Sequence, residues 1–153
     1  MFQKILWVTD FSAHARDAGR KALECAQCSH RAVDVVTVVA PDDLPPFLLD
    51  VPDPFIAEEA VHAAERRLEA EHEATVQQEL EAETQFLRDG GIETTLHVRV
   101  GSPADEILAA AQELGSDVIV MGSHGNHGPA DILLGSTVEH VTKRATCPVL
   151  VVR

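Results

Sequence analysis

The sequence predicts one α/β domain in which five parallel strands alternate with four helices in an open, doubly wound sheet. Short runs of apolar, mostly β-branched residues recur along the chain and have the length of buried strands. Between them lie segments whose apolar residues follow helical spacing. The length of 153 residues suits a single domain, 1–153, with a sizeable core, and no internal repeat is visible.

The first unit reads as strand, helix, strand. The apolar run 5–8 is followed by Asp10-Phe11-Ser12, a turn that ends in a good helix cap. Apolar residues then recur at helical spacing from Ala13 to Ser29, and the nearly unbroken β-branched run Val33 to Val39 predicts a second buried strand. This order predicts a parallel pair joined by a right-handed crossover.

An irregular, proline-rich loop is predicted at residues 40–56, because five prolines there remove donors and interrupt helices. It can be a lid over a ligand, a partner-binding surface or a mobile connector. A long helix is predicted from Ala57 to Asp89, where the Gly90-Gly91 pair stops it. It has one apolar stripe and an acidic opposite face, and its length lets its first turns project past the core.

The remaining elements follow the same alternation. A strand ends at Val100, and Pro103 stands in the first turn of a helix that ends at Gly115-Ser116. The apolar run 117–121 predicts the fourth strand, the last helix runs to Ala145, and Val149-Leu150-Val151-Val152 is the fifth strand.

Composition excludes several classes. The net charge of −13 and isoelectric point near 4.8 argue against nucleic acid or an anionic membrane as a partner. No signal-peptide core or membrane-length apolar segment is visible, which favours a cytoplasmic location. Cys25 and Cys28 form a C-x-x-C near the end of a helix, where the dipole opposes a thiolate, so packing in or near the core is favoured over redox or zinc chemistry.

The stretch from Met121 to Val138 is the strongest functional signal. Gly122 and Gly125 open a turn-rich loop, and Gly135 follows after nine intervening residues. Ser136 and Thr137 stand where the N-cap and first turn of the last helix are expected, so N–H groups and hydroxyls would converge on one spot. Such a spot binds phosphate, although a capped helix without a ligand has the same local pattern.

These residues resemble the nucleotide-binding signature of the universal stress protein family, in its ATP-binding subtype. Residues 4–12, with their Thr-Asp-x-Ser turn, resemble the opening strand of that family, 100–107 its step into the third helix, and 147–152 its closing strand. The four motifs occur in the family's order and span most of the chain. The resemblance implies a Rossmann-like sheet of the adenine nucleotide alpha hydrolase-like group, with strand order 3-2-1-4-5.

The resemblance also implies a site. Adenosine would lie against Thr9, Asp10 and Val38, and the other predicted residues would border the nucleoside or hold phosphates. Asp10 is equally a good turn residue, and Val38 and Met121 can be core residues. The predicted nucleotide-binding residues are Thr9, Asp10, Val38, Gly101, Met121, Gly122, His124, Gly125, Gly135, Ser136, Thr137 and Val138.

One departure from the family concerns charge. Members often carry Arg or Lys where this chain has Asn126, His127, Pro129, Ala130 and Asp131. A triphosphate would then leave more of its charge to a divalent metal, so ATP with Mg²⁺ or Mn²⁺ is expected, with ADP and AMP open. His124 and His127 could be metal ligands, but a role as exposed loop residues is favoured, so the metal-binding residues stay unassigned.

No Walker motif and no paired base and nucleophile stands out, which favours slow or no turnover. The expected function is that of a cytoplasmic stress-response regulator with the nucleotide as regulatory ligand. The alternatives are a nucleotide-free member that acts through dimerisation and protein contacts, and a slow ATPase. The resemblance further implies a homodimer, in which the hydrophobic edge strand Val149, Leu150, Val151 and Val152 pairs antiparallel with its copy; a further protein partner is unidentified.

Overall fold

The computed structural model of the chain describes residues 2–29, 32–40, 58–125 and 134–153. The proline-rich segment predicted at residues 40–56 therefore lies outside the described residues, except for Ala40, and so do Asn126 to Asp131.

The five strands form one parallel sheet in the order β3-β2-β1-β4-β5, which confirms the predicted fold class and strand order. Residue Ile5 pairs with Val33 on one side and with Val118 on the other, so β1 is the centre of the sheet. The carboxyl ends of all five strands lie at one edge because the strands are parallel. The strands are β1 (Ile5–Val8), β2 (Val33–Val39), β3 (Thr94–Val100), β4 (Val118–Gly122) and β5 (Val149–Val152).

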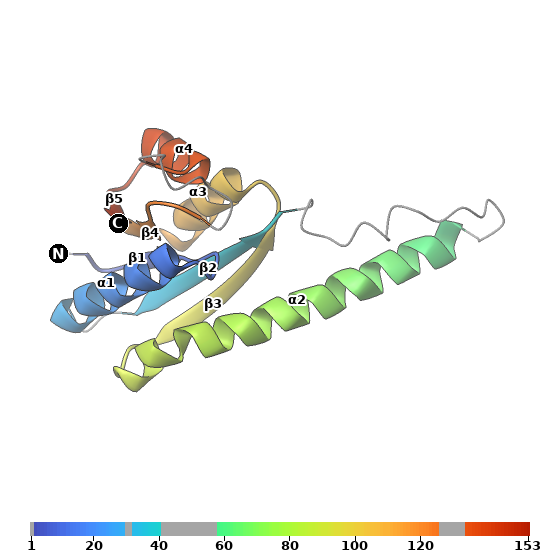
Figure 1. The fold of residues 1–153 in the computed structure, drawn as a ribbon, viewed down its shortest axis with the longest axis horizontal. Coiled ribbons are helices and arrows are strands. Elements are labelled where there is room, and N and C mark those ends of the chain that lie inside the picture. The colour runs from blue at the N-terminus through green and yellow to red at the C-terminus, as the bar shows by residue number, and fades with distance from the viewer. Residues whose placement is uncertain (1, 30–31, 41–57, 126–133) are drawn as a thin grey trace.

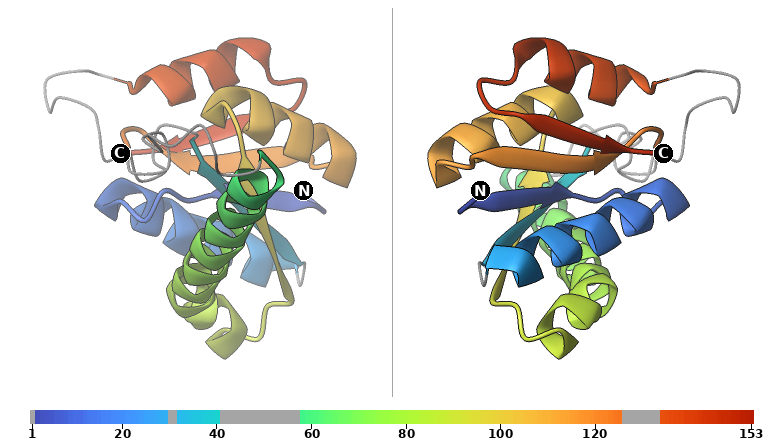
Figure 2. Two further views of the ribbon diagram at one scale, coloured as in Figure 1. Left: turned by 90° about the vertical axis from the view of Figure 1, so that its right-hand side faces the viewer. Right: turned by 90° about the vertical axis from the view of Figure 1, so that its left-hand side faces the viewer.

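The helices cover both faces of the sheet, α1 and α2 on one side and α3 and α4 on the other (Figure 2). Side chains of β1 alternate between the two cores: Ile5 and Trp7 pack with the α1–α2 layer, and Leu6 and Val8 with the α3–α4 layer. A strand buried on both faces needs apolar residues at every position, which explains the unbroken run. The helices are α1 (Ala13–Ser29), α2 (Glu58–Asp89), α3 (Pro103–Leu114) and α4 (Ser136–Arg144).

Helix α1 approaches the sheet closely because its buried face carries small residues. A Cβ added at Gly19 would lie 2.4 Å from the ring of Trp7, so only glycine fits beneath the indole. The indole Nε1–H donates to the Ala15 carbonyl at 2.9 Å, and the Phe86 ring meets it edge-on at 5.7 Å. Trp7 thus joins β1 to α1 and α2.

Helix α2 is 32 residues long, and its first turns extend beyond the sheet, as the sequence predicts (Figure 1). Val76, Leu80 and Leu87 are buried on its inner side. Within the described part of the chain, none of the helices has the length and hydropathy to span a membrane.

The cysteine prediction is partly wrong. Cys25 is half-buried and packs against the core, and burial raises the pKa of its thiol, with Cys28 and Glu24 adding to the effect. Cys28 is exposed, because the last turn of α1 carries it away from the core.

Candidate functional site

The carboxyl ends of β1 and β4 and the start of α1 meet in direct backbone contact. A Cβ added at Gly122 would lie 2.6 Å from the backbone carbonyl carbon of His14. The carbonyl carbon is a backbone atom, so it cannot move away without a shift of the α1 main chain. Gly122 therefore allows the end of β4 to lie against the first turn of α1.

The turn after β1 is held by three side chains that accept backbone N–H groups. Thr9 Oγ1 accepts from Phe11 at 3.1 Å, Asp10 Oδ1 from Ser12 at 3.0 Å, and Ser12 Oγ from Ala15 at 3.2 Å. The last of these confirms Ser12 as the cap of α1. Phe11 has a φ of 64°, a left-handed conformation that costs about 1–2 kcal/mol for a residue other than glycine. Side-chain hydrogen bonds thus hold the turn in a strained conformation, at the edge of the sheet where ligands bind in folds of this kind.

Asp10 reaches from this turn to the loop after β4. A Cβ added at Gly125 would lie 2.6 Å from Asp10 Oδ2, so the glycine leaves room for the carboxylate. Two predicted site residues separated by 115 positions are therefore adjacent, and both are exposed.

The start of α4 differs from the prediction at one residue. The N-cap is Gly135, not Ser136, since the Gly135 carbonyl accepts the first helical bond from Glu139 at 3.0 Å. The Gly135 N–H donates to the Ser123 carbonyl at 2.8 Å. The N–H groups of the first helical turn, at Ser136, Thr137 and Val138, have no acceptor inside the helix and form the anion-binding end.

Several predicted residues lie at this edge with their side chains buried. Thr9 is 1% exposed, Met121 4% and Val138 3%, so these residues offer a ligand little accessible surface. Val38 is half-buried and packs against the α3–α4 core. Gly101 lies at the same edge, but it follows β3 and donates its N–H to the Val39 carbonyl, so β2 separates it from the β1 turn.

Two residues that the sequence did not single out also lie here. His14, in the first turn of α1, places its ring 5.2 Å from the ring of His124, measured between centroids. Glu83 reaches in from α2; its side chain is only 9% exposed and binds Arg16 at 3.1 Å, while one carboxylate oxygen lies 3.4 Å from the hydroxyl of Thr9. His14 could have been suspected from its place two residues after the Ser12 cap, whereas nothing local identifies Glu83 within an acidic helix.

The anion-binding end of α4 depends on backbone dipoles. The basic residues of α4, Lys143 and Arg144, occupy its last turn, at the opposite end. The first turn carries Glu139. The hydrogen bond from Lys143 and its positive charge lower the pKa of this carboxyl group below its usual value. No group of three or more potential metal ligands occurs in residues 2–29, 32–40, 58–125 and 134–153.

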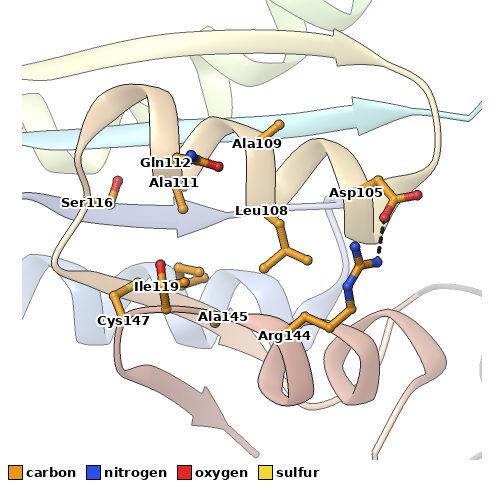
Figure 3. Close-up of a pocket in the computed structure, with 11 residues that line it drawn as sticks. Asp105, Leu108, Ala109, Ala111, Gln112, Ser116, Ile119, Arg144, Ala145 and Cys147 are labelled. Atoms are coloured by element: carbon orange, nitrogen blue, oxygen red, sulfur yellow. Dashed lines mark hydrogen bonds and ion pairs between the residues drawn. The ribbon is translucent and has the colours of Figure 1, made fainter.

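A separate cavity of about 340 Å³ lies between α3 and α4 (Figure 3). Leu108 and Ile119 line it, and the ion pair of Asp105 and Arg144, 2.8 Å long, bridges the two helices at its rim. None of the predicted nucleotide-binding residues lines this cavity.

Known proteins resemble the chain over its whole length. The universal stress protein family matches residues 1–153. Universal stress protein MJ0577 of Methanocaldococcus jannaschii is 32% identical over 158 residues, which cover 100% of this chain and 96% of that protein. Universal stress protein YxiE of Bacillus subtilis is 34% identical over 161 residues, and the alignment covers 100% of both.

Solved structures agree with the sequence comparisons. The structure of MJ0577 superposes with a TM-score of 0.82 at 30% identity, covering 99% of this chain and 96% of that one. Universal stress protein UspA from Lactobacillus plantarum shares the fold, with a TM-score of 0.75 at 24% identity over 99% of this chain and 97% of that one. Because the match to the family extends from the first residue to the last, the chain belongs to the universal stress protein family.

Proposed function

We propose that this protein binds an adenine nucleotide, ATP in the first place, in the crevice at the carboxyl ends of β1 and β4, and that the nucleotide acts there as a regulatory ligand. The protein would work in the cytoplasm as a stress-response regulator and turn ATP over slowly or not at all.

The observation that carries the proposal is the meeting of three segments at one edge. The Thr9–Ser12 turn, Gly125 and the start of α4 are brought together by direct contacts. Asp10 Oδ2 lies 2.6 Å from the Cβ position of Gly125, and backbone atoms of residues 123–125 lie 3.6–3.8 Å from the Cβ position of Gly135. An exposed carboxylate suits a ribose or base, and the first-turn N–H groups of α4 suit phosphate.

Structures of the same fold support the choice of ligand class. One universal stress protein was solved in complex with cAMP, and one from Archaeoglobus fulgidus with dAMP. Each is 22% identical to this chain, so this likeness supports the fold, and the proposal rests on the geometry above.

The donors present fit a nucleotide better than they fit a free Mg²⁺ ion. Mg²⁺ prefers oxygen ligands, and the described residues contain no cluster of three candidates. A Mg²⁺ or Mn²⁺ ion would therefore take its ligands from phosphate oxygens and water, and the ion itself would supply the positive charge that the first turn of α4 lacks.

The proposal includes a homodimer through β5. Leu150 is 38% exposed on this edge strand, and the unpaired backbone groups of the outer edge can pair with a second copy. The alternative function is that of a protein that binds no nucleotide and acts by dimerisation and protein contacts.

The deciding experiment is acid release of ligand from freshly purified protein, followed by mass spectrometry and an absorbance spectrum. We expect an adenine nucleotide at close to one per chain. If none is released, calorimetric titration with ATP and Mg²⁺ decides, and absence of binding there would contradict the proposal in favour of the nucleotide-free alternative.

Gly125→Ala gives a matched variant for the same titration. The added methyl group would displace the Asp10 carboxylate from its place beside residue 125, so we expect weaker ATP binding. Gly91→Ala is the control, because a Cβ there has no neighbour within 4 Å and lies far from the crevice in sequence and fold; its φ of 76° costs stability but leaves the site unchanged.

A further inference from the structure

Helix α2 places a carboxylate with little exposure behind the turn that follows β1. The side chain of Glu83 is only 9% exposed. Leu80 and Leu87 on the same helix are completely buried in the core, so the backbone that carries Glu83 is packed against the sheet. Removing a carboxylate from water costs free energy, and apolar side chains of similar size often replace buried ion pairs without loss of stability. Stability alone therefore gives no reason for a carboxylate at this position.

Each oxygen of this carboxylate has one partner, and the two partners lie on either side of the turn. Oε1 of Glu83 accepts a hydrogen bond from the hydroxyl of Thr9 at 3.4 Å, a long bond that the charge of the acceptor strengthens. Oε2 accepts one from Nε of Arg16 at 3.1 Å, and the backbone N–H of Arg16 donates to the Ser12 carbonyl. Glu83 therefore connects α2 to both ends of the Thr9–Ser12 turn.

The hydroxyl of Thr9 passes this contact on to the turn. A hydroxyl has one proton to donate, and an ionised carboxylate can only accept. Within residues 2–29, 32–40, 58–125 and 134–153, Glu83 is the only acceptor for the hydroxyl proton of Thr9. With its proton directed to Glu83, Thr9 Oγ1 has its lone pairs free for the N–H of Phe11, from which it accepts at 3.1 Å. The carboxylate thus sets the direction of the hydrogen bond that holds Phe11.

Phe11 is the strained residue of this turn. Its φ of 64° lies in the left-handed region, where a residue other than glycine persists only if neighbouring contacts hold it. The adjacent Asp10 depends on this backbone, since its Oδ1 accepts the N–H of Ser12 at 3.0 Å and its Oδ2 lies 2.6 Å from the Cβ position of Gly125. Relaxation of Phe11 would rotate the peptide next to Asp10 and move the carboxylate.

We propose that Glu83 is a positioning residue for the nucleotide site. Acting through the hydroxyl of Thr9, it holds Phe11 in its left-handed conformation and so fixes the carboxylate of Asp10 beside Gly125. The part of this proposal that concerns the ligand rests on the proposed function, in which Asp10 binds the ribose or base. Glu83 acts through the turn and not by contact with the nucleotide.

The first experiment follows backbone amide hydrogen exchange by NMR in the full chain without nucleotide. Glu83→Met introduces an unbranched side chain that lacks the carboxylate acceptor. We expect the Phe11 amide to exchange roughly fivefold faster or more in this variant, relative to the Thr9 amide, which donates to the Val36 carbonyl at 3.0 Å and reports on the sheet. An unchanged ratio of the two rates would overturn the proposal, because a general loss of stability speeds both amides alike.

Variants of two threonines separate the role of the hydroxyl from that of general packing. Thr9→Val should reproduce the faster Phe11 exchange, Thr9→Ser should keep the wild-type ratio, and Glu83→Met added to Thr9→Val should have no further effect, since both break the same bond. Thr84→Val is the matched control: it removes a completely buried hydroxyl from the residue after Glu83, where it bonds to the Leu80 carbonyl at 2.8 Å. It should leave the ratio unchanged, and an effect equal to that of Glu83→Met would overturn the proposal.

The second experiment titrates the same variants with ATP and Mg²⁺ by calorimetry. Glu83→Met should weaken binding about fivefold, the size of one hydrogen bond, while Thr84→Val should stay within about twofold of wild type. Wild-type ATP affinity in Glu83→Met, despite faster Phe11 exchange, would overturn the role of Glu83 in the site and leave the proposed function standing. If the wild-type protein binds no ATP, the nucleotide function fails, whereas the exchange ratio still decides whether Glu83 holds the turn.

Discussion

The variant Gly135→Ala tests whether Gly135 is needed for nucleotide binding or for folding. The residue has φ −67° and ψ 156°, an extended conformation that alanine adopts freely. A Cβ there would have its nearest neighbours at 3.6–3.8 Å, ordinary contact distances. Alanine is a poorer N-cap than glycine by up to about 1 kcal/mol, but it also lowers the entropy of the unfolded chain by about 0.4–1 kcal/mol. We therefore expect the free energy of unfolding to change by less than about 1 kcal/mol.

Nucleotide binding should respond differently. The methyl group would stand at the start of α4, beside the N–H groups that the proposed phosphates need. Hydrogen bonds to a charged group contribute about 1.5–3 kcal/mol each, so lengthening even one of them should raise the dissociation constant for ATP about tenfold or more.

The assay combines calorimetric titration with thermal unfolding. Trp7 is the only tryptophan, the chain has no tyrosine, and the indole is completely buried, so its fluorescence reports unfolding of the core. Gly122→Ala is the reference variant, since its Cβ would lie 2.6–2.8 Å from main-chain and Cβ atoms of His14. Such overpacking costs about 1–3 kcal/mol, or roughly 2–4 °C of melting temperature per kcal/mol at this chain length. Wild-type ATP affinity in Gly135→Ala would refute phosphate binding at α4, and a melting temperature as low as that of Gly122→Ala would show that Gly135 is needed for folding.

Three further predictions follow from burial and charge. The exposed Cys28 should react with a thiol reagent at neutral pH well before Cys147, because burial raises the pKa of the Cys147 thiol and leaves less thiolate. Mass spectrometry of partly labelled protein gives the order of reaction, and equal rates would contradict the prediction. Arg16→Met should lower the free energy of unfolding by about 1–2 kcal/mol in urea titrations, because it leaves the carboxylate of Glu83, 9% exposed, without its cation; an unchanged midpoint would show that the pair is dispensable. Leu150→Glu should shift a dimer to monomer in sedimentation at micromolar concentration, while Phe2→Glu, equally exposed but outside β5, should not, and a wild-type monomer would rule out the dimer.

Three strands, β1, β2 and β4, could be predicted because they are short, mostly apolar and largely buried, whereas β3 carries Thr, His and Arg and has no fully buried residue. Trp7 and Leu6 pack on opposite sides of β1, so the run 5–8 has no polar position, and that pattern is visible in the sequence alone. The order of the strands has no such local signal. It followed from the resemblance of four motifs to a known family, and the sheet confirms it.

Two local predictions failed because a longer-range contact decided the outcome. Serine is a better N-cap than glycine in isolation, yet the bond from the Gly135 N–H to the Ser123 carbonyl fixes the chain one residue earlier, and α4 begins at Ser136. Cys28 follows Cys25 by three residues, a spacing that shares a helix face, but α1 ends one residue later, and Cys28 stays in solvent.

The residues that the sequence missed are brought to the site by tertiary structure. Glu83 lies 74 positions from Thr9, and His14 lies 110 positions from His124. Neither pair leaves a periodic pattern or a motif, because each depends on how α1 and α2 pack against β1 and β4. Such contacts can be read only from the assembled fold.

The charge balance of the crevice explains why the proposed nucleotide needs a companion cation. Its anion-binding end consists of backbone N–H groups, which carry dipoles but no net charge, in a chain whose formal charge is −13. A triphosphate brought to this edge therefore needs a cation, and the cation is held jointly by the phosphates and by whatever the chain supplies. Because coupling between two ligands is reciprocal, Mg²⁺ and ATP must raise each other's affinity for the protein by the same factor. A difference between the factor measured with ATP as titrant and the factor measured with Mg²⁺ as titrant would contradict a shared site.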